Sequence, residues 1–84
     1  MNMNHVKLLF FATIRERAGA KFLEMDVPAD LTIHALKERI SVEHPNLKES
    51  MKSVLITINR EYAFDEAVIP QNAEIAMFPP VSGG

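Results

Sequence analysis

The sequence contains no cysteine and only three glycines, which are Gly19, Gly83 and Gly84. Without cysteine, the chain cannot have a disulfide scaffold, a thiolate metal site or a cysteine nucleophile. With so few glycines, it has no glycine-rich phosphate loop. Any reactive sulfur must therefore come from a partner or be installed on the chain. The absence of cysteine also fits a protein of the cytoplasm, and that is the location we expect.

No charge of one sign dominates, because nine basic and eleven acidic residues leave a net charge of −2. There is no basic stripe to follow a phosphate backbone, so we expect no nucleic-acid partner. The longest apolar run, Leu8 to Ala12, is far shorter than the roughly 20 residues that span a bilayer. The N-terminus also lacks the charged start, apolar run and cleavage site of a secretory signal. We therefore expect no membrane partner.

What the chain does contain is a high share of hydrophobic residues, 48% of 84. This is enough for one small domain with its own core. We predict a single domain over residues 1–78 and an extended tail over residues 79–84. Alternating apolar residues predict strands over residues 5–11, 21–27, 54–59, 62–64 and 74–78.

Helical spacing of Ile33, Leu36 and Ile40 predicts one main helix, with Thr32 as its N-cap and an end near His44. Residues 12–19 predict a short helical turn that is closed by glycine. The polar stretches 1–4 and 46–53 predict a frayed end and a loop, and we expect a turn at residues 60–61. Residues 65–73 predict an irregular crossover.

The predicted order is two strands, a helix and three further strands. It favours an α+β fold in which the main helix packs on one face of a mixed sheet. A helix between early and late strands favours a central parallel pair. This is the β-grasp, or ubiquitin-like, roll, and its tail leaves from the end of a central strand.

An ordinary active site is hard to assemble from this sequence. The histidines at positions 5, 34 and 44 are too scattered for a local metal motif, so we expect no metal site. No serine has a histidine at a spacing that supports nucleophilic catalysis. We expect no bound cofactor, and a self-contained enzyme is not indicated.

The C-terminal tail is more informative. Pro79 and Pro80 favour an extended chain, and Val81 and Ser82 lead to a Gly83-Gly84 tip without Cβ atoms. Six extended residues reach roughly 20 Å from the domain, so a narrow active site could admit the tip. The alternative is a frayed end with no function.

A free carboxylate at Gly84 is a poor acyl donor, but ATP can convert it to an acyl adenylate. A sulfur nucleophile can then attack the activated carbonyl and leave a thiocarboxylate at Gly84. Such a group is ionised and nucleophilic, as thiolates are. It could deliver sulfur to an electrophilic small molecule in a partner's pocket.

Two segments of the chain resemble a known family. Residues 8–16, with the sequence LLFFATIRE, and residues 78–84, with the sequence FPPVSGG, are similar to the molybdopterin synthase sulfur carrier subunit, or MoaD, family. The similarity extends over nearly the whole chain in length and in the order of elements.

The resemblance implies a β-grasp fold and a defined chemistry. A ubiquitin-activating-enzyme-like adenylyltransferase would use ATP to activate Gly84, and a sulfur donor protein would supply the thiocarboxylate sulfur. Two small subunits would join a dimeric molybdopterin synthase large subunit, which supplies the catalytic residues. There the tail would donate sulfur to cyclic pyranopterin monophosphate, and this chain would be carrier and co-substrate.

Strand alternation separately predicts a surface for a partner. If Val6, Leu8 and Phe10 face the helix, Leu9 and Phe11 face away, and Phe78 does so in the last strand. If these strands are neighbours, Leu9, Phe11 and Phe78 form an apolar patch beside the tail. A covering loop or flank is the alternative. Arg15 could add a polar contact at the rim, as could Arg17, although a solvated turn explains both equally well.

Two other functions stay open. The chain could be a ubiquitin-like sulfur carrier of another pathway, such as thiamine synthesis or thiolation, or a modifier of protein lysines. It could also be a non-catalytic β-grasp binding module with a passive tail.

Overall fold

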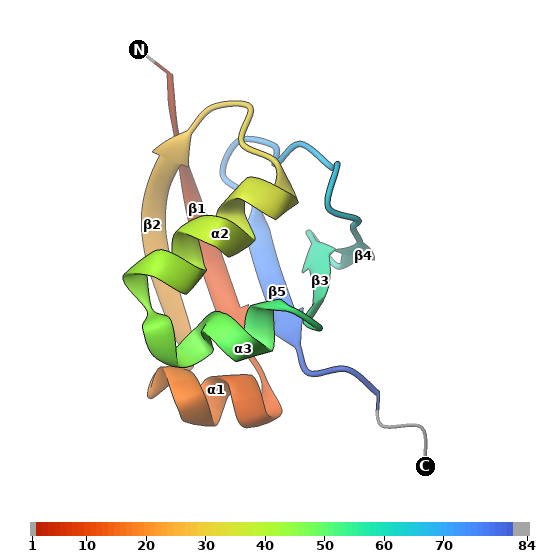
Figure 1. Cartoon of the computed structure of the whole chain (residues 1–84). Coiled ribbons are helices and arrows are strands. Elements are labelled where there is room, and N and C mark those ends of the chain that lie inside the picture. Colours follow the sequence, from red (N-terminus) through yellow and green to blue (C-terminus); the bar gives the residue numbers. More distant parts are fainter. Residues whose placement is uncertain (1, 82–84) are drawn as a thin grey trace.

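The computed structural model of the chain describes residues 2–81. A sheet is covered on one face by helices, and a short helix closes one end (Figure 1). In chain order the elements are β1 (Met3–Phe10), α1 (Ala12–Ala18), β2 (Phe22–Pro28), α2 (Ile33–Glu43), the 3₁₀ turn η1 (Pro45–Leu47), α3 (Lys48–Met51), β3 (Leu55–Ile58), β4 (Glu61–Tyr62) and β5 (Glu74–Phe78).

The strands form one five-stranded sheet in the order β2-β1-β5-β3-β4. The central strands β1 and β5 pair in parallel, with Leu9 opposite Ala76, and the other pairs are antiparallel. The predicted mixed sheet with a central parallel pair is therefore confirmed. Its last strand lies between two neighbours, so the tail leaves from the middle of the sheet.

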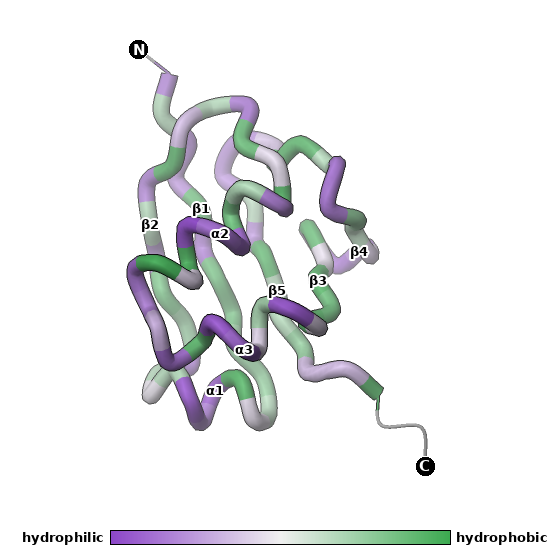
Figure 2. Tube along the Cα trace, viewed as in Figure 1, coloured by the Kyte–Doolittle hydropathy of each residue, from purple (hydrophilic) through white to green (hydrophobic). Residues whose placement is uncertain are grey.

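The core lies between α2 and the facing side of the sheet. Val6 and Leu8 of β1, Leu36 of α2, and Ile75 and Met77 of β5 are fully buried. Figure 2 shows hydrophobic residues concentrated along the strands, whereas α2 and α3 carry hydrophilic stretches. The inward positions predicted from alternation are thus confirmed. Within residues 2–81, no helix has the length and apolar character needed to cross a bilayer.

Two predicted helix boundaries have the expected chemistry. The Thr32 side chain accepts a hydrogen bond of 3.2 Å from the backbone N–H of Ala35, which caps the start of α2. Helix α1 ends at Gly19, which adopts φ +72° and donates its N–H to the carbonyl of Arg15. Glycine is favoured there because a side chain disfavours this left-handed conformation.

The turn between β3 and β4 lies one residue earlier than predicted. Asn59 and Arg60 both have positive φ, at +48° and +74°. A two-residue hairpin turn of this kind requires two left-handed residues, and asparagine tolerates that conformation well. The prediction of the turn at residues 60–61 was therefore wrong by one position.

The prediction of a frayed N-terminus over residues 1–4 was wrong for residues 3 and 4, because β1 begins at Met3 and Asn4 is 1% exposed. The Asn4 amide donates to the carbonyl of Pro70 at 2.8 Å, and its side-chain oxygen accepts the N–H of Asn72 at 2.8 Å. A third contact reaches the carbonyl of Ile69 at 3.4 Å. A polar residue can be buried when its hydrogen bonds are satisfied, as they are here.

The prediction of a loop over residues 46–53 was also wrong. This segment contains η1 and α3, and it buries Leu47 and Met51, which are 1% and 5% exposed. These two residues are four apart, so both can point to the core from consecutive turns. The surrounding polar residues hide this short pattern.

Candidate functional site at the root of the C-terminal tail

The tail begins where β5 ends. Phe78 is the last residue of the strand, and Pro79 follows at once. Neither Pro79 nor Pro80 has a backbone N–H, so neither can donate to a continued strand ladder. Val81 is 85% exposed. Residues 82–84, which carry the predicted Gly84 chemistry, lie outside the described residues.

Two aromatic rings meet at the root of the tail. The rings of Phe11 and Phe78 stack with centroids 4.6 Å apart and planes 9° apart. The backbone N–H of Phe11 also donates to the carbonyl of Met77 at 3.2 Å, which ties the end of β1 to β5. The structure thus brings together the two aromatic residues that the sequence placed beside the tail.

The stack is part of a larger apolar surface on the sheet face opposite α2. We call this surface the outer-face patch, and its members are Leu9, Phe11, Phe22, Leu55 and Phe78. Strand register places Leu9 opposite Phe22 and Leu55 opposite Phe78. Phe11 and Phe22 are 39% and 48% exposed, so in the described chain no loop closes over this end of the face. Binding of a partner to the patch remains a prediction.

Phe22 and Leu55 were missed in the sequence prediction, although a signal was present. Phe22 lies in the strand predicted over residues 21–27 and is two residues before Glu24, so alternation places it on the same face as that charged residue. Leu55 needed the antiparallel pairing of β3 with β5, which the sequence alone does not give.

Charged residues border the patch toward the other end of β1 and β2. The ammonium of Lys7 lies 4.7 Å from the ring centroid of Phe22, a cation–π geometry. His5 lies between two carboxylates, with Nε2 2.7 Å from Glu24 and Nδ1 2.8 Å from Asp26. Hydrogen bonds to Glu24 and then Asp26 raise the pKa of His5 above its usual value. The outer face therefore changes from apolar to charged along its strands.

Arg15, the predicted rim residue, lies in the last turn of α1 and is exposed. It lines an open depression with Ala12, Gly19 and Lys21. Arg17 borders a different depression, so the two arginines do not share one site. A partner role for Arg15 stays a prediction.

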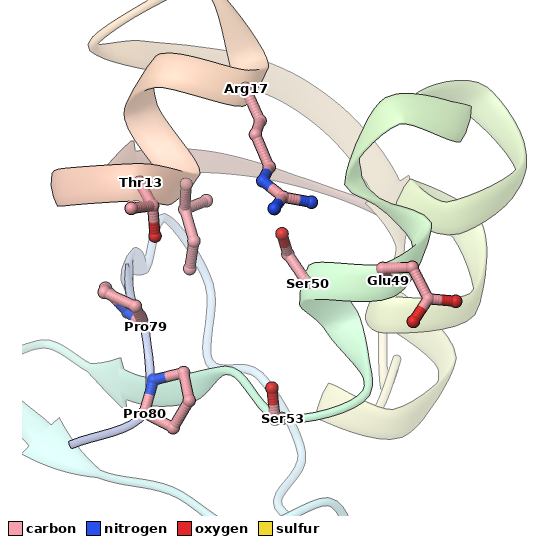
Figure 3. A pocket seen from close by; sticks show the side chains of 8 residues that line it. Thr13, Arg17, Glu49, Ser50, Ser53, Pro79 and Pro80 are labelled. Carbon is pink, nitrogen blue, oxygen red and sulfur yellow. The ribbon is translucent and has the colours of Figure 1, made fainter. Parts of the chain in front are cut away.

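On the helix side of the tail root there is an open hollow of about 190 Å³. It is formed by α1, by the segment from α3 to Ser53, and by the two prolines of the tail (Figure 3). Its lining residues are Thr13, Ile14, Arg17, Glu49, Ser50, Ser53, Pro79 and Pro80. Sequence reasoning did not find it, because three segments distant in the sequence build it.

The described part of the chain holds no group of three or more histidine and acidic side chains that could bind a metal ion. The ion pairs Lys37–Asp65, at 2.7 Å, and Lys52–Glu49, at 2.9 Å, lie on the surface. Lys37 lowers the pKa of Asp65, chiefly through its hydrogen bond.

Comparison with known proteins gives consistent relatives. The chain matches the ThiS family over residues 8–84. It is 33% identical over 79 residues to the molybdopterin synthase sulfur carrier subunit of Arabidopsis thaliana, covering 94% of this chain and 82% of that one. The subunit of the same name from Dictyostelium discoideum is 34% identical over 84 residues, covering 96% and 98%.

Solved structures share the fold. SAMP1 from Haloferax volcanii, named small archaeal modifier protein 1 in a second structure, superposes with a TM-score of 0.81 at 29% identity, covering 96% of this chain and all of that one. A complex of subunits 1 and 2 of the molybdopterin-converting factor from Helicobacter pylori contains a chain with a TM-score of 0.63 at 25% identity, covering 95% and 99%. From its sequence match and its β-grasp fold, this chain belongs to the ThiS family of ubiquitin-like sulfur carriers, alongside the molybdopterin synthase sulfur carrier subunits.

Proposed function

We propose that this chain is the sulfur carrier subunit of molybdopterin synthase and that Gly84 carries the sulfur. The observation that supports this most directly is the tail root. The chain leaves the central strand β5 next to the stacked Phe11 and Phe78, and two prolines follow. A partner that binds the outer-face patch would hold the body in place while the tail extends into its active site.

The proposed chemistry has four steps, namely activation, sulfur loading, sulfur transfer and hydrolysis. An adenylyltransferase transfers AMP from ATP to the Gly84 carboxylate and releases pyrophosphate. The outer sulfur of a persulfide on a donor protein then attacks the carbonyl and displaces AMP. A thiol cleaves the resulting acyl disulfide, which forms a disulfide with the donor cysteine and leaves a thiocarboxylate at Gly84. In the active site of the large subunit, this sulfur attacks an electrophilic carbon of cyclic pyranopterin monophosphate, so that a carbon–sulfur bond forms and the bond from that carbon to its oxygen substituent breaks. Water then cleaves the bond between the glycyl carbonyl and sulfur, which regenerates the carboxylate.

The partners of this proposal are a large subunit, an activating enzyme and a sulfur donor protein. The likeness to one chain of the Helicobacter pylori complex supports a partner of the large-subunit type. Because this chain has no cysteine, the sulfur must be supplied from outside. The catalytic residues would belong to the large subunit, and this chain would be consumed and regenerated as a co-substrate.

Intact mass spectrometry tests the chemistry. After incubation with ATP, an activating enzyme and a sulfur donor, we expect a mass gain equal to the replacement of one oxygen by sulfur. A chain that lacks Gly84 should fold normally, as judged by circular dichroism, and should show no gain. Normal sulfur loading of that truncated chain would refute the proposal.

The likeness to small archaeal modifier proteins keeps a second function in view, namely attachment of Gly84 to protein lysines. Co-purification distinguishes the two. A sulfur carrier of molybdopterin synthase forms a stable complex with the large subunit, whereas a modifier appears in covalent conjugates through Gly84. A passive tail predicts that adding a residue after Gly84 changes neither result.

A further inference from the structure

The hollow on the helix side of the tail root has polar side chains on two facing walls. Thr13 and Arg17 are four residues apart on α1, so they share one face of that helix. Ser50 in α3 and Ser53 just after it lie across the gap (Figure 3). The Asn46 side chain donates to the carbonyl of Arg17, which links α1 to η1. The two walls are therefore held together.

The polar groups in the hollow are not used by the fold. Within residues 2–81, the Arg17 guanidinium takes part in no salt bridge or hydrogen bond, and the hydroxyls of Thr13, Ser50 and Ser53 bond to no other protein group. Figure 3 shows the Arg17 guanidinium and the Ser50 hydroxyl pointing toward each other into the hollow. A cation and three hydroxyls together can bind a negatively charged oxygen of another molecule.

Local charge also favours an anion here, although the whole chain has a net charge of −2. Glu49 is the one acidic residue that lines the hollow, and its carboxylate lies 2.9 Å from Lys52. This hydrogen bond is the main reason why the pKa of Glu49 is lowered. The charges of Lys48 and Arg17 also lower this pKa, so three cations surround a single carboxylate and the local charge remains positive.

We propose that this hollow binds an aspartate or glutamate side chain of the protein that receives the tail. The carboxylate would pair with Arg17 and accept hydrogen bonds from the hydroxyls of Ser50 or Thr13. Only the identity of that protein, the large subunit, rests on the proposed function. Pro79 and Pro80 form one wall, so an occupant of the hollow would contact the tail where it leaves the body.

A carboxylate side chain fits better than a free nucleotide. The hollow measures about 190 Å³, below the roughly 300–1,000 Å³ of sites that enclose small molecules. Its chemistry also differs from that of the outer-face patch on the opposite side of the sheet. A partner that uses both surfaces would contact the tail root from two sides.

An anion titration tests the site without any partner. We would add sodium acetate to the isotope-labelled full chain at constant ionic strength, with sodium chloride as the matched salt and inorganic phosphate as a second anion. Acetate should shift the NMR signals of the Arg17 side chain and the Ser50 and Ser53 amides, and Arg17→Gln should abolish the shift. A stronger response to phosphate, or one unchanged in Arg17→Gln, would overturn the carboxylate assignment.

Binding to the large subunit, measured by calorimetry, tests the partner. We expect Arg17→Gln to weaken binding about tenfold or more, Arg17→Lys to weaken it less, and higher salt to narrow the difference. Arg39→Ala is the matched loss of a guanidinium, because Arg39 lies on α2 and pairs with Glu43. Wild-type binding that Arg17→Gln leaves intact would refute this inference but not the proposed function. If the wild type does not bind, the proposed function fails and the acetate titration alone decides the inference.

Discussion

The two ends of the parallel β1–β5 pair differ in how their side chains are covered. We call the end where both strands begin the entry end, and the end where both strands finish and the tail leaves the exit end. At the entry end, Asn4 is buried and makes its hydrogen bonds to Pro70 and Asn72 inside the molecule. At the exit end, Phe11 and Phe22 are partly open to solvent, and the Arg17 guanidinium makes no hydrogen bond or salt bridge within residues 2–81.

This difference separates stability from recognition. Groups that are satisfied internally stabilise the fold, whereas exposed apolar rings and an unpaired cation contribute energy when a partner covers them. Substitutions at the entry end should therefore lower the free energy of unfolding. Substitutions at the exit end should mainly lower the affinity for a partner.

The largest expected effect lies at the exit end. Phe11→Ala should weaken binding to the large subunit by about 3 kcal/mol, more than a hundredfold, since aromatic anchors often dominate interfaces. The free energy of unfolding should fall by only about 1 kcal/mol through loss of the stack with Phe78. Calorimetric titration and urea denaturation measure the two quantities.

Val42→Ala is the control for loss of an exposed apolar side chain. Val42 is 79% exposed and lies on α2, which covers the sheet face opposite the outer-face patch. Its truncation should leave binding unchanged. If Phe11→Ala and Val42→Ala weaken binding equally, the exit end is not the binding surface.

Asn4→Ala tests whether the entry end contributes to stability. It removes hydrogen bonds that satisfy Pro70 and Asn72, so the free energy of unfolding should fall by about 2 kcal/mol. The folded variant should bind the large subunit as tightly as the wild type. Asn2→Ala, at a neighbouring exposed asparagine, should change stability by less than about 0.5 kcal/mol. Urea denaturation measures the free energy of unfolding of both variants. Equal losses of stability in Asn4→Ala and Asn2→Ala would contradict an internal structural role for Asn4.

The contrast between the two ends also explains what the sequence could predict. Strand β5 was predicted with its observed bounds, and the meeting of Phe11 with Phe78 followed from alternation once β1 and β5 were neighbours. These features depend on local periodicity and on one pairing. The exit end could be predicted from the sequence because apolar residues stand at strand positions where a solvent-facing sheet would carry polar ones.

The entry end and the hollow could not be predicted in the same way. Asn4 is a polar residue that local alternation gives no reason to bury, and its burial depends on Pro70 and Asn72, far along the chain. Helix α3 is polar except for its buried Met51, so its composition favours a loop. The hollow needs α1, α3 and the tail at once, and no local pattern encodes that meeting.

A smaller effect is expected at Gly19, which ends α1 on the exit side. Gly19→Ala should lower the free energy of unfolding by about 1 kcal/mol, because alanine disfavours φ +72°. An added Cβ would meet no atom within 4 Å, so the cost arises from the backbone alone. Gly19→Asn should cost less, since asparagine tolerates this conformation. Equal urea midpoints for the glycine and alanine proteins would contradict this account.

The smallest effect concerns His5, on the charged part of the outer face. Its folded-state pKa is raised above 6.5 by Glu24 and Asp26, so its contribution is fully present below that pH and is lost as pH rises through the folded pKa. His5→Gln should therefore lower the melting temperature slightly near about pH 6 and leave it unchanged near about pH 9. Thermal melts across this range check the sign. A larger loss at high pH would contradict the protonated pair.

The pairing of the first strand with the last has a consequence for the order of events in the cell. Leu9 and Phe11 are made early in synthesis, whereas Phe78 is made just before the tail. The outer-face patch therefore comes into existence only after β5 has been synthesised and has inserted beside β1. A truncated or misfolded chain has no such surface, even if it still contains the apolar residues. An enzyme that binds the patch before it acts on the tail would therefore act only on chains in which β1 and β5 have already paired.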